Sequence, residues 1–320
     1  MSFSKKNNLI AAIFLVSQIS ISQIKLKIEK NQTYFTEGKD SILTYQAAEK
    51  SLNGKYNRSN YIHPLYNLDG SILSEDFPAD HLHHRGIFWA WHQLYIGNKR
   101  IGDGWEIENF KCEVSSVKEK RQKDFSKAIQ STVLWKSPLW KDKKGVEKAF
   151  VKETTVIRVY PKQHNYRLID IEISILALEP NMKIGGSEDE KGYGGFSPRI
   201  KLSEDIIFTN PKGKISPTNL AIPASEWMDV SGSIGKNNTS AGLTVLCNPQ
   251  NPGFPNPWIL RAKKSMQNAV YPFPGSKAIP LSNKKPTVLR YRLVVHDGNA
   301  NAVPIAEIYK NYTKKKIATD

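Results

Sequence analysis

The strongest constraint on the fold is a strict two-residue alternation near the middle of the chain. Isoleucines occupy every second position and polar residues fill the positions between them: Ile169, Asp170, Ile171, Glu172, Ile173, Ser174 and Ile175. In an extended chain, successive side chains point to opposite faces. The segment therefore predicts a half-buried antiparallel strand, with its isoleucines on one face.

The same period recurs along most of the sequence. Leu289, Tyr291, Leu293 and Val295 alternate with Arg290, Arg292 and His296, and shorter alternating runs occupy residues 86–95, 151–160 and 243–247. Helical spacing is confined to the C-terminal end, where Pro304 suits a first helical turn and apolar side chains follow three or four residues apart: Ile305, Ile308, Tyr309 and Tyr312. We predict an all-β protein with one short C-terminal helix.

Turn-forming residues separate these strands. Gly185–Gly186, Gly192–Gly195 and the proline-dense residues 248–257 are interpreted as ordered loops or covers over a sheet. Hydrophobic residues make up 39% of the chain, which is enough for a large core, and neither an internal repeat nor a compositional linker divides it. The simplest architecture is one antiparallel two-sheet β-sandwich over residues 23–320.

Residues 1–22 have the pattern of a secretory signal. Lys5 and Lys6 precede the apolar run 9–16, and small residues follow at 20–22. A buried N-terminal helix or a membrane anchor is the alternative, but the run is short for a span. We expect an exported protein, periplasmic or extracellular, whose mature chain has no transmembrane span. Cys112 and Cys247 then form one disulfide or remain two buried thiols.

The chain is strongly basic, with 46 Lys and Arg against 30 Asp and Glu and a net charge of +16. Such a charge suits nucleic acid, an anionic surface or an acidic polymer. The lysine-rich segments at 118–123 and 314–316 lack the aromatic series of a nucleic-acid site, so we interpret them as solvated. We expect no nucleic-acid partner.

Five of the seven histidines fall between residues 61 and 106: His63, His81, His83, His84 and His92. Asp80, Glu106 and Arg85 accompany them, together with Trp89, Trp91 and Trp105. If residues 80–85 are extended, His81 and His83 share a face and His84 points the other way. On the next strand, Phe88, Ala90 and His92 share the face opposite Trp89 and Trp91.

Three interpretations of this cluster remain open. His63, His81, His83 and His92 are candidate ligands of a divalent metal ion, with Asp80 or Glu106 completing the shell. Alternatively, one histidine transfers protons with a carboxylate partner while a tryptophan stacks on a sugar ring. For any single histidine, a structural role beneath a loop is the third alternative.

A series of short motifs follows one order along nearly the whole mature chain: His63–Tyr66, Asp80–Trp89, Asp103–Trp105, Gly192–Phe196, Trp227–Gly232, Asn248-Pro249 with Asn251-Pro252, and Arg290–Gly298. Together they resemble an exported bacterial family often labelled "methane oxygenase PmoA". The label suits an integral membrane protein, whereas this mature chain has no spanning segment. The resemblance implies a protein of uncharacterised function, linked to glycan degradation, with a supersandwich fold similar to galactose mutarotase.

The resemblance also implies a pocket on a concave sheet face, lined by His, Arg, Asp, Glu and Trp. The catalytic candidates are His63, Asp80, His81, His83, His84 and His92. The substrate-binding candidates are Arg85, Trp89, Trp91, Trp105, Glu106, Arg199, Asp229 and His296. In this hypothesis Arg85 and Arg199 orient a substrate anion.

We therefore expect an exported protein that acts on a carbohydrate, with the charge balance pointing to an anionic one. As an enzyme it would be a hydrolase, lyase or epimerase that uses acid/base chemistry. The alternatives are a metal-dependent hydrolase or oxygenase and a non-catalytic glycan-binding module.

Overall fold

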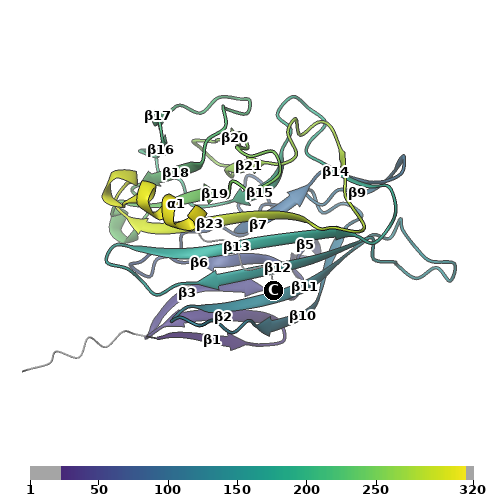
Figure 1. Ribbon diagram of the computed structural model, residues 1–320, viewed down its shortest axis with the longest axis horizontal. Helices are drawn as coiled ribbons and strands as arrows, with labels where there is room; N and C mark the ends of the chain where they lie inside the picture. The colour runs from purple at the N-terminus through teal and green to yellow at the C-terminus, as the bar shows by residue number, and fades with distance from the viewer. Residues whose placement is uncertain (1–22, 315–320) are drawn as a thin grey trace, which may run out of the picture.

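The computed structural model describes residues 23–314, and its strands form two large antiparallel sheets that face each other (Figure 1). The first sheet has nine strands, in the order β10 (Lys111–Glu119), β11 (Lys127–Lys136), β12 (Val151–Val159), β13 (Tyr166–Ala177), β23 (Thr287–Asp297), β19 (Ala241–Cys247), β18 (Trp227–Gly232), β16 (Ile207–Asn210) and β17 (Gly213–Ile215).

The second sheet has eight strands, in the order β1 (Ile24–Ile28), β2 (Gln32–Glu37), β3 (Asp40–Gln46), β6 (Tyr61–Leu65), β7 (Ile87–Trp91), β15 (Gly194–Pro198), β21 (Asn268–Val270) and β20 (Trp258–Ile259). A four-stranded sheet, β22 (Ile279–Pro280), β14 (Met182–Gly185), β8 (Gln93–Ile96) and β9 (Lys99–Gly102), and the hairpin β4 (Lys50–Leu52) and β5 (Lys55–Arg58) complete the strands. Among residues 23–314, the helices are α1 (Ile305–Lys314) and two 3-10 turns, η1 (Lys236–Asn238) and η2 (Ala300–Ala302).

The alternating isoleucines lie where their period places them. β13 pairs with β12 on one side and β23 on the other, and its four isoleucines are buried in the space between the sheets. Contact across that space is direct, because the ring of Phe196 on β15 stacks on Tyr291 of β23 at 4.3 Å. The prediction of an all-β antiparallel sandwich is confirmed.

The short C-terminal helix is also confirmed. In α1, Ile305, Ile308 and Tyr312 are buried and pack with Val294 of β23 and Leu246 of β19. The helix therefore covers the outer face of the nine-stranded sheet at one end, as Figure 1 shows.

Two of the predicted glycine loops are strands in the structure. Gly185 ends β14, and Gly194 and Gly195 begin β15. These strands need glycine because their neighbours approach closely: a Cβ on Gly195 would lie 2.6 Å from the carbonyl oxygen of Ala269. The proline-dense segment 248–257 is a loop, as predicted.

A carboxylate lies within the core. Glu153 of β12 is fully buried, and four donors converge on it. Its Oε1 accepts hydrogen bonds from Asn60 (2.8 Å), Trp89 (2.9 Å) and Thr155 (2.6 Å), and its Oε2 accepts one from Trp135 at 2.9 Å. The carboxylate thereby links side chains from both large sheets, and burial raises its pKa.

Three expectations concern export: a signal segment, the absence of a membrane span and the state of the two cysteines. The predicted signal, residues 1–22, lies outside the described residues. Within residues 23–314, no helix is long and apolar enough to cross a membrane. Cys112 and Cys247 are two free thiols rather than a disulfide.

Candidate functional site

The histidine cluster lies over the outer face of the eight-stranded sheet. β7 alternates as predicted, with Phe88 and Ala90 packed outward beside Trp105, while Trp89 and Trp91 belong to the main core. The indole of Trp89 donates to Glu153, and that of Trp91 donates to the carbonyl of Tyr271 at 2.7 Å. These two tryptophans therefore lie away from the histidines, and the structure offers neither of them to a sugar.

The histidines are brought together by turns rather than by a strand. The His81 N–H donates to the carbonyl of Pro78 (3.0 Å), and the His84 N–H donates to the carbonyl of His81 (2.9 Å). As a result, the rings of His81 and His84 stack at 4.6 Å, and His83 meets both edge-on. The extended conformation considered for residues 80–85 is wrong, because the chain turns twice there.

Arg85, at the end of this turn, is held by hydrogen bonds inside the protein. Its Nε pairs with Asp76, its Nη1 donates to the carbonyls of Lys50 (3.0 Å) and Tyr56 (2.7 Å), and its Nη2 donates to the Tyr61 hydroxyl. The side chain is fully buried. The prediction was that Arg85 orients a substrate anion. The structure does not fit this prediction, because the guanidinium group is buried and bonded to protein acceptors.

Arg199 has the same kind of role. Its Nε donates to Glu75 (2.7 Å), and its Nη1 and Nη2 donate to both oxygens of Asp80 (2.9 and 2.7 Å). Asp80 also contacts Nδ1 of His81 at 2.7 Å. Although partial burial alone would raise the pKa of Asp80, the bonds from Arg199 and His81 hold it well below its usual range. Asp80 thus stays ionised and secures the turn, and Arg199 is a buried structural partner.

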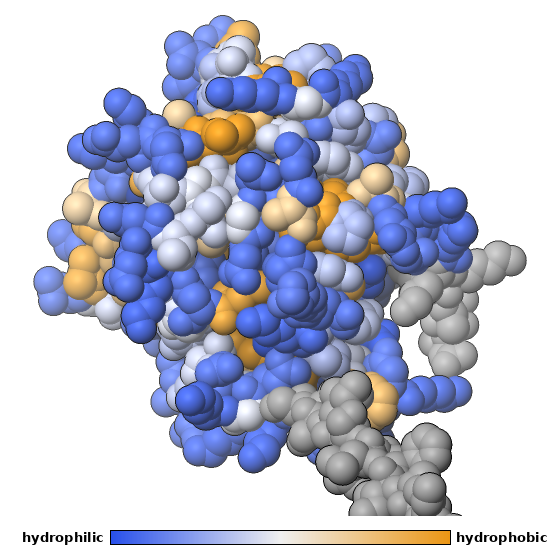
Figure 2. Space-filling model, turned by 90° about the vertical axis from the view of Figure 1, so that its left-hand side faces the viewer, coloured by the Kyte–Doolittle hydropathy of each residue, from blue (hydrophilic) through white to orange (hydrophobic). Residues whose placement is uncertain are grey.

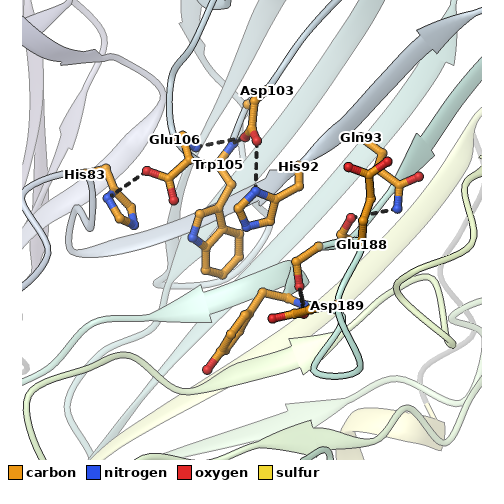
Figure 3. A network of polar contacts seen from close by, with 12 residues as sticks. His83, His92, Gln93, Asp103, Trp105, Glu106, Glu188 and Asp189 are labelled. Atoms are coloured by element: carbon orange, nitrogen blue, oxygen red, sulfur yellow. Dashed lines mark hydrogen bonds and ion pairs between the residues drawn. The ribbon is translucent and has the colours of Figure 1, made fainter. Parts of the chain in front are cut away.

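A second group of side chains surrounds the turn after β9 (Figure 3). Asp103 Oδ1 accepts the N–H groups of Trp105 (2.8 Å) and Glu106 (2.9 Å), and its Oδ2 accepts Nδ1–H of His92 at 2.9 Å. Arg100 also contacts Oδ2, at 3.3 Å. His92 stacks on Trp105 at 5.3 Å, so this nearly buried indole supports the imidazole instead of presenting a free face.

Glu106 reaches back from this turn toward the histidines. Its Oε2 lies 3.1 Å from Nδ1 of His83, as Figure 3 shows, while 46% of its side chain remains exposed. Burial raises the pKa of Glu106. Burial and the positive charge of Arg58 lower the pKa of His83 to about 4, so His83 is neutral at pH 7. The pKa of Glu106 is therefore raised and the pKa of His83 is lowered, although the two side chains are in contact.

The remaining candidates lie elsewhere. Nδ1 of His63 contacts the hydroxyl of Ser74 at 2.9 Å, and burial lowers the pKa of His63 to about 4. Asp229 and His296 belong to the nine-stranded sheet, where both are fully buried and bonded to each other at 2.8 Å. Thr244 also donates to Asp229, at 2.7 Å. This buried pair is not part of the histidine cluster.

Three contributors were not among the predicted site residues: Arg58, Asp103 and Tyr193, of which the last two lie in motifs that carry the family resemblance. The buried Arg58 donates to the carbonyls of Gly104 (2.9 Å) and Trp105 (3.0 Å), and the ring of Tyr193 lies 5.8 Å from that of Trp105. The Asp103-Gly104 dipeptide was the available signal, because aspartate before glycine is typical of a turn held by its own side chain.

The metal hypothesis named His63, His81, His83 and His92 as ligands. In the part of the chain that the structure describes, no group of three or more His, Cys, Asp or Glu side chains is arranged to hold a metal ion. The imidazoles of His81, His83 and His84 instead meet through their faces and edges.

The chain matches the model of one protein family. Residues 32–310 match the model of a family of unknown function, DUF6807. The chain belongs to this family. The family description names no activity, so the resemblance to proteins labelled "methane oxygenase PmoA" remains an expectation. No curated protein matches the sequence.

One solved structure that resembles the chain is the α-galactosidase from Lactobacillus brevis, with a TM-score of 0.37 and 7% sequence identity. The match covers 87% of this chain, which spans 40% of the α-galactosidase.

The buried His84 makes a testable contribution to pH-dependent stability. Burial lowers its pKa to about 2, far below the 6.5 of an unfolded histidine. The unfolded chain therefore binds the proton first, so this contribution is complete above pH 6.5 and is lost as the pH falls. Relative to His84→Gln, the wild type should lose about 2 to 3 kcal/mol between pH 7 and pH 4.

Urea unfolding of both proteins across this pH range measures the difference, and replacing the exposed His164 by Gln provides the control. Parallel pH profiles for the wild type and His84→Gln would contradict the prediction.

Proposed function

We propose that the protein is a carbohydrate-active enzyme whose proton-transfer groups are His92 and Glu106. The observation that carries the proposal is the pairing of two His–carboxylate contacts around one turn: His92 with Asp103 at 2.9 Å and His83 with the half-exposed Glu106 at 3.1 Å. Perturbed pKa values are typical of acid/base sites, and here burial raises the pKa of Glu106 and lowers that of His83.

Asp103 selects one tautomer of the His92 imidazole. Its carboxylate accepts the Nδ1–H, which leaves Nε2 as the nitrogen able to take up a proton. Trp105 fixes the plane of the ring by stacking. His92 is therefore suited to act as a general base.

Glu106 is suited to the opposite step. Its half-exposed carboxyl has a raised pKa, which favours the protonated form that a general acid needs. The neutral His83 beside it positions the carboxyl without adding a full positive charge. Together His92 and Glu106 supply a base and an acid. In hydrolysis the base would take a proton from the attacking water while the acid protonates the leaving oxygen. In elimination or epimerisation the base would take a proton from a sugar carbon, and the acid would protonate the leaving oxygen or return a proton to that carbon.

The substrate class rests on the motif resemblance to exported proteins linked to glycan degradation. The export implied by the N-terminal pattern is compatible with an extracellular or periplasmic glycan. The surface chemistry agrees, because imidazole, carboxyl and phenol groups exchange hydrogen bonds with sugar hydroxyls.

A substrate screen tests this function. Purified protein is incubated with neutral and acidic mono- and oligosaccharides, and proton NMR detects new anomers, epimers, unsaturated products or released reducing ends. We expect conversion of at least one sugar by the wild type and none by Glu106→Gln. Binding of a sugar without conversion would support the glycan-binding module instead, and conversion that survives Glu106→Gln would contradict the assignment of Glu106.

A further inference from the structure

A groove of about 370 Å³ lies on the outer face of the nine-stranded sheet, on the opposite side of the sandwich from the histidine cluster. Its floor is formed by outward side chains of β12, β13 and β23, and Tyr312 of α1 closes one side. In Figure 1 these three strands run side by side, with α1 over β23. The volume falls within the range of about 300 to 1,000 Å³ that is usual for small-molecule sites.

Charged side chains form rows across the groove floor. The strand register aligns Arg158, Asp170 and Arg292 in one row, and it places Glu172 opposite Arg290 in the next. Arg292 holds both oxygens of Asp170, at 2.6 and 2.8 Å, and Nε of Arg290 holds Glu172 at 2.8 Å. These carboxylates are already neutralised by their arginines and still have exposed surface.

Aromatic rings hold the arginines in place. The guanidinium groups of Arg158 and Arg292 lie 4.7 and 5.3 Å from the ring of Tyr160, and Arg292 also lies 4.5 Å from the ring of Tyr312. Such contacts restrict long side chains that would otherwise lose rotamer freedom when a ligand binds. The floor is therefore ordered before any ligand arrives.

Positive donors remain unused at this floor. Within residues 23–314, the two terminal nitrogens of Arg290 make no hydrogen bond and the ammonium group of Lys120 has no ion-pair partner. Lys120 lies beside Ala128 of β11, on the other side of the groove from Arg290, so a ligand with two anionic groups would meet Arg290 with one and Lys120 with the other. Its hydroxyl groups could donate to Asp170 and Glu172. Arginine is well suited to carboxylate and sulfate because its terminal nitrogens form a planar fork.

The end of the molecule near α1 is mostly polar. Figure 2 views the molecule from the left-hand side of Figure 1 and shows mostly hydrophilic residues, with apolar areas that are small and separate.

We propose that this groove is a second binding site, which takes an acidic saccharide carrying carboxylate or sulfate groups. One anionic group lies against Arg290 and another against Lys120, and the sugar hydroxyls lie along Asp170 and Glu172. The site shares only the carbohydrate class with the proposed enzyme activity. Its test is a binding measurement, so it can succeed or fail whether or not the histidine cluster is catalytic.

Calorimetric titration of the full chain tests the groove. The probes are a trimer of galacturonate, a sulfated galactose trimer and the neutral galactose trimer. We expect at least one acidic trimer to bind at least tenfold more tightly than the neutral one, with an affinity that falls as salt is added. The two acidic probes identify which anion the groove prefers, and failure of both to bind would overturn the proposal.

Variants locate the bound trimer. Arg290→Gln should weaken binding about tenfold, and Lys120→Gln, which disturbs no ion pair among the described residues, should weaken it several-fold. Lys39→Gln, in the exposed turn between β2 and β3, is the matched charge control and should bind normally. Loss of binding in His92→Gln with full binding in both groove variants would place the ligand at the histidine cluster and overturn the proposal.

Discussion

Replacing Glu153 by alanine should lower the free energy of unfolding by about 4 kcal/mol. The change deletes the acceptor shared by Asn60, Trp89, Trp135 and Thr155, so four donors lose their partner inside the core. It also leaves a cavity between the two sheets. Urea unfolding followed by tryptophan fluorescence measures the change.

Glu153→Gln separates the two causes. The amide keeps the side-chain volume and one acceptor oxygen for the donors on Oε1, but its NH₂ group faces the Trp135 indole N–H, which needs an acceptor. We expect Gln to cost about 1 to 2 kcal/mol, because one buried hydrogen bond is lost. Thr154→Ala, on the outward face of the same strand, is the control and should cost less than about 1 kcal/mol. A loss below about 1 kcal/mol for Glu153→Ala would show that these donors do not depend on the carboxylate.

The sequence predicted the sheets because burial follows local period. The isoleucines of β13 alternate strictly, and they lie between the sheets together with Leu289, Tyr291, Leu293 and Val295 of β23. Glu153 stands at an inward position of β12, in phase with the buried Val151 and Ile157. What the sequence could not supply is its set of partners, since Asn60 and Trp89 come from distant segments.

Site geometry was less predictable because turns depend on contacts that are distant in sequence. The histidine turn is held by Arg199, which lies more than a hundred residues beyond Asp80. Without that contact, residues 80–85 were equally compatible with a strand. The same reason explains Arg85 and Arg199, whose predicted role in binding an anion assumed exposed guanidinium groups, whereas both are buried against protein acceptors.

Strand pairing also explains the glycines that were predicted to form loops. Glycine-rich sequence is typical of turns. At Gly194 and Gly195, however, the missing side chains allow close backbone approach to Gly186 and Ala269, a tertiary requirement that a local pattern does not carry. The two-residue period predicted strands correctly where alternate side chains face a common core. It did not reveal β15, where the closely packed backbone of Gly194 and Gly195 makes the contact.

Asp103→Asn should reduce turnover of a substrate found by the screen by a factor of about 10² to 10⁴ while leaving the fold intact. The Asp103 Oδ1 accepts two backbone N–H groups, from Trp105 and Glu106. An asparagine at this position must therefore keep its oxygen on the turn and point its NH₂ group at Nδ1 of His92. His92 then accepts at Nδ1 and carries its proton on Nε2, where it can no longer act as a base.

Asp142→Asn is a matched control for this substitution. Asp142 Oδ1 likewise accepts two backbone N–H groups, from Lys144 (2.8 Å) and Val146 (2.9 Å), in an exposed turn without a histidine partner. Unfolding curves should match the wild type for both variants, and kcat should fall only in Asp103→Asn. His92→Gln should lose a similar factor, and the double variant should lose little more, because both changes disable the same base. Wild-type kcat in Asp103→Asn would remove His92 from the proton-transfer step and leave Glu106 as the group to test next.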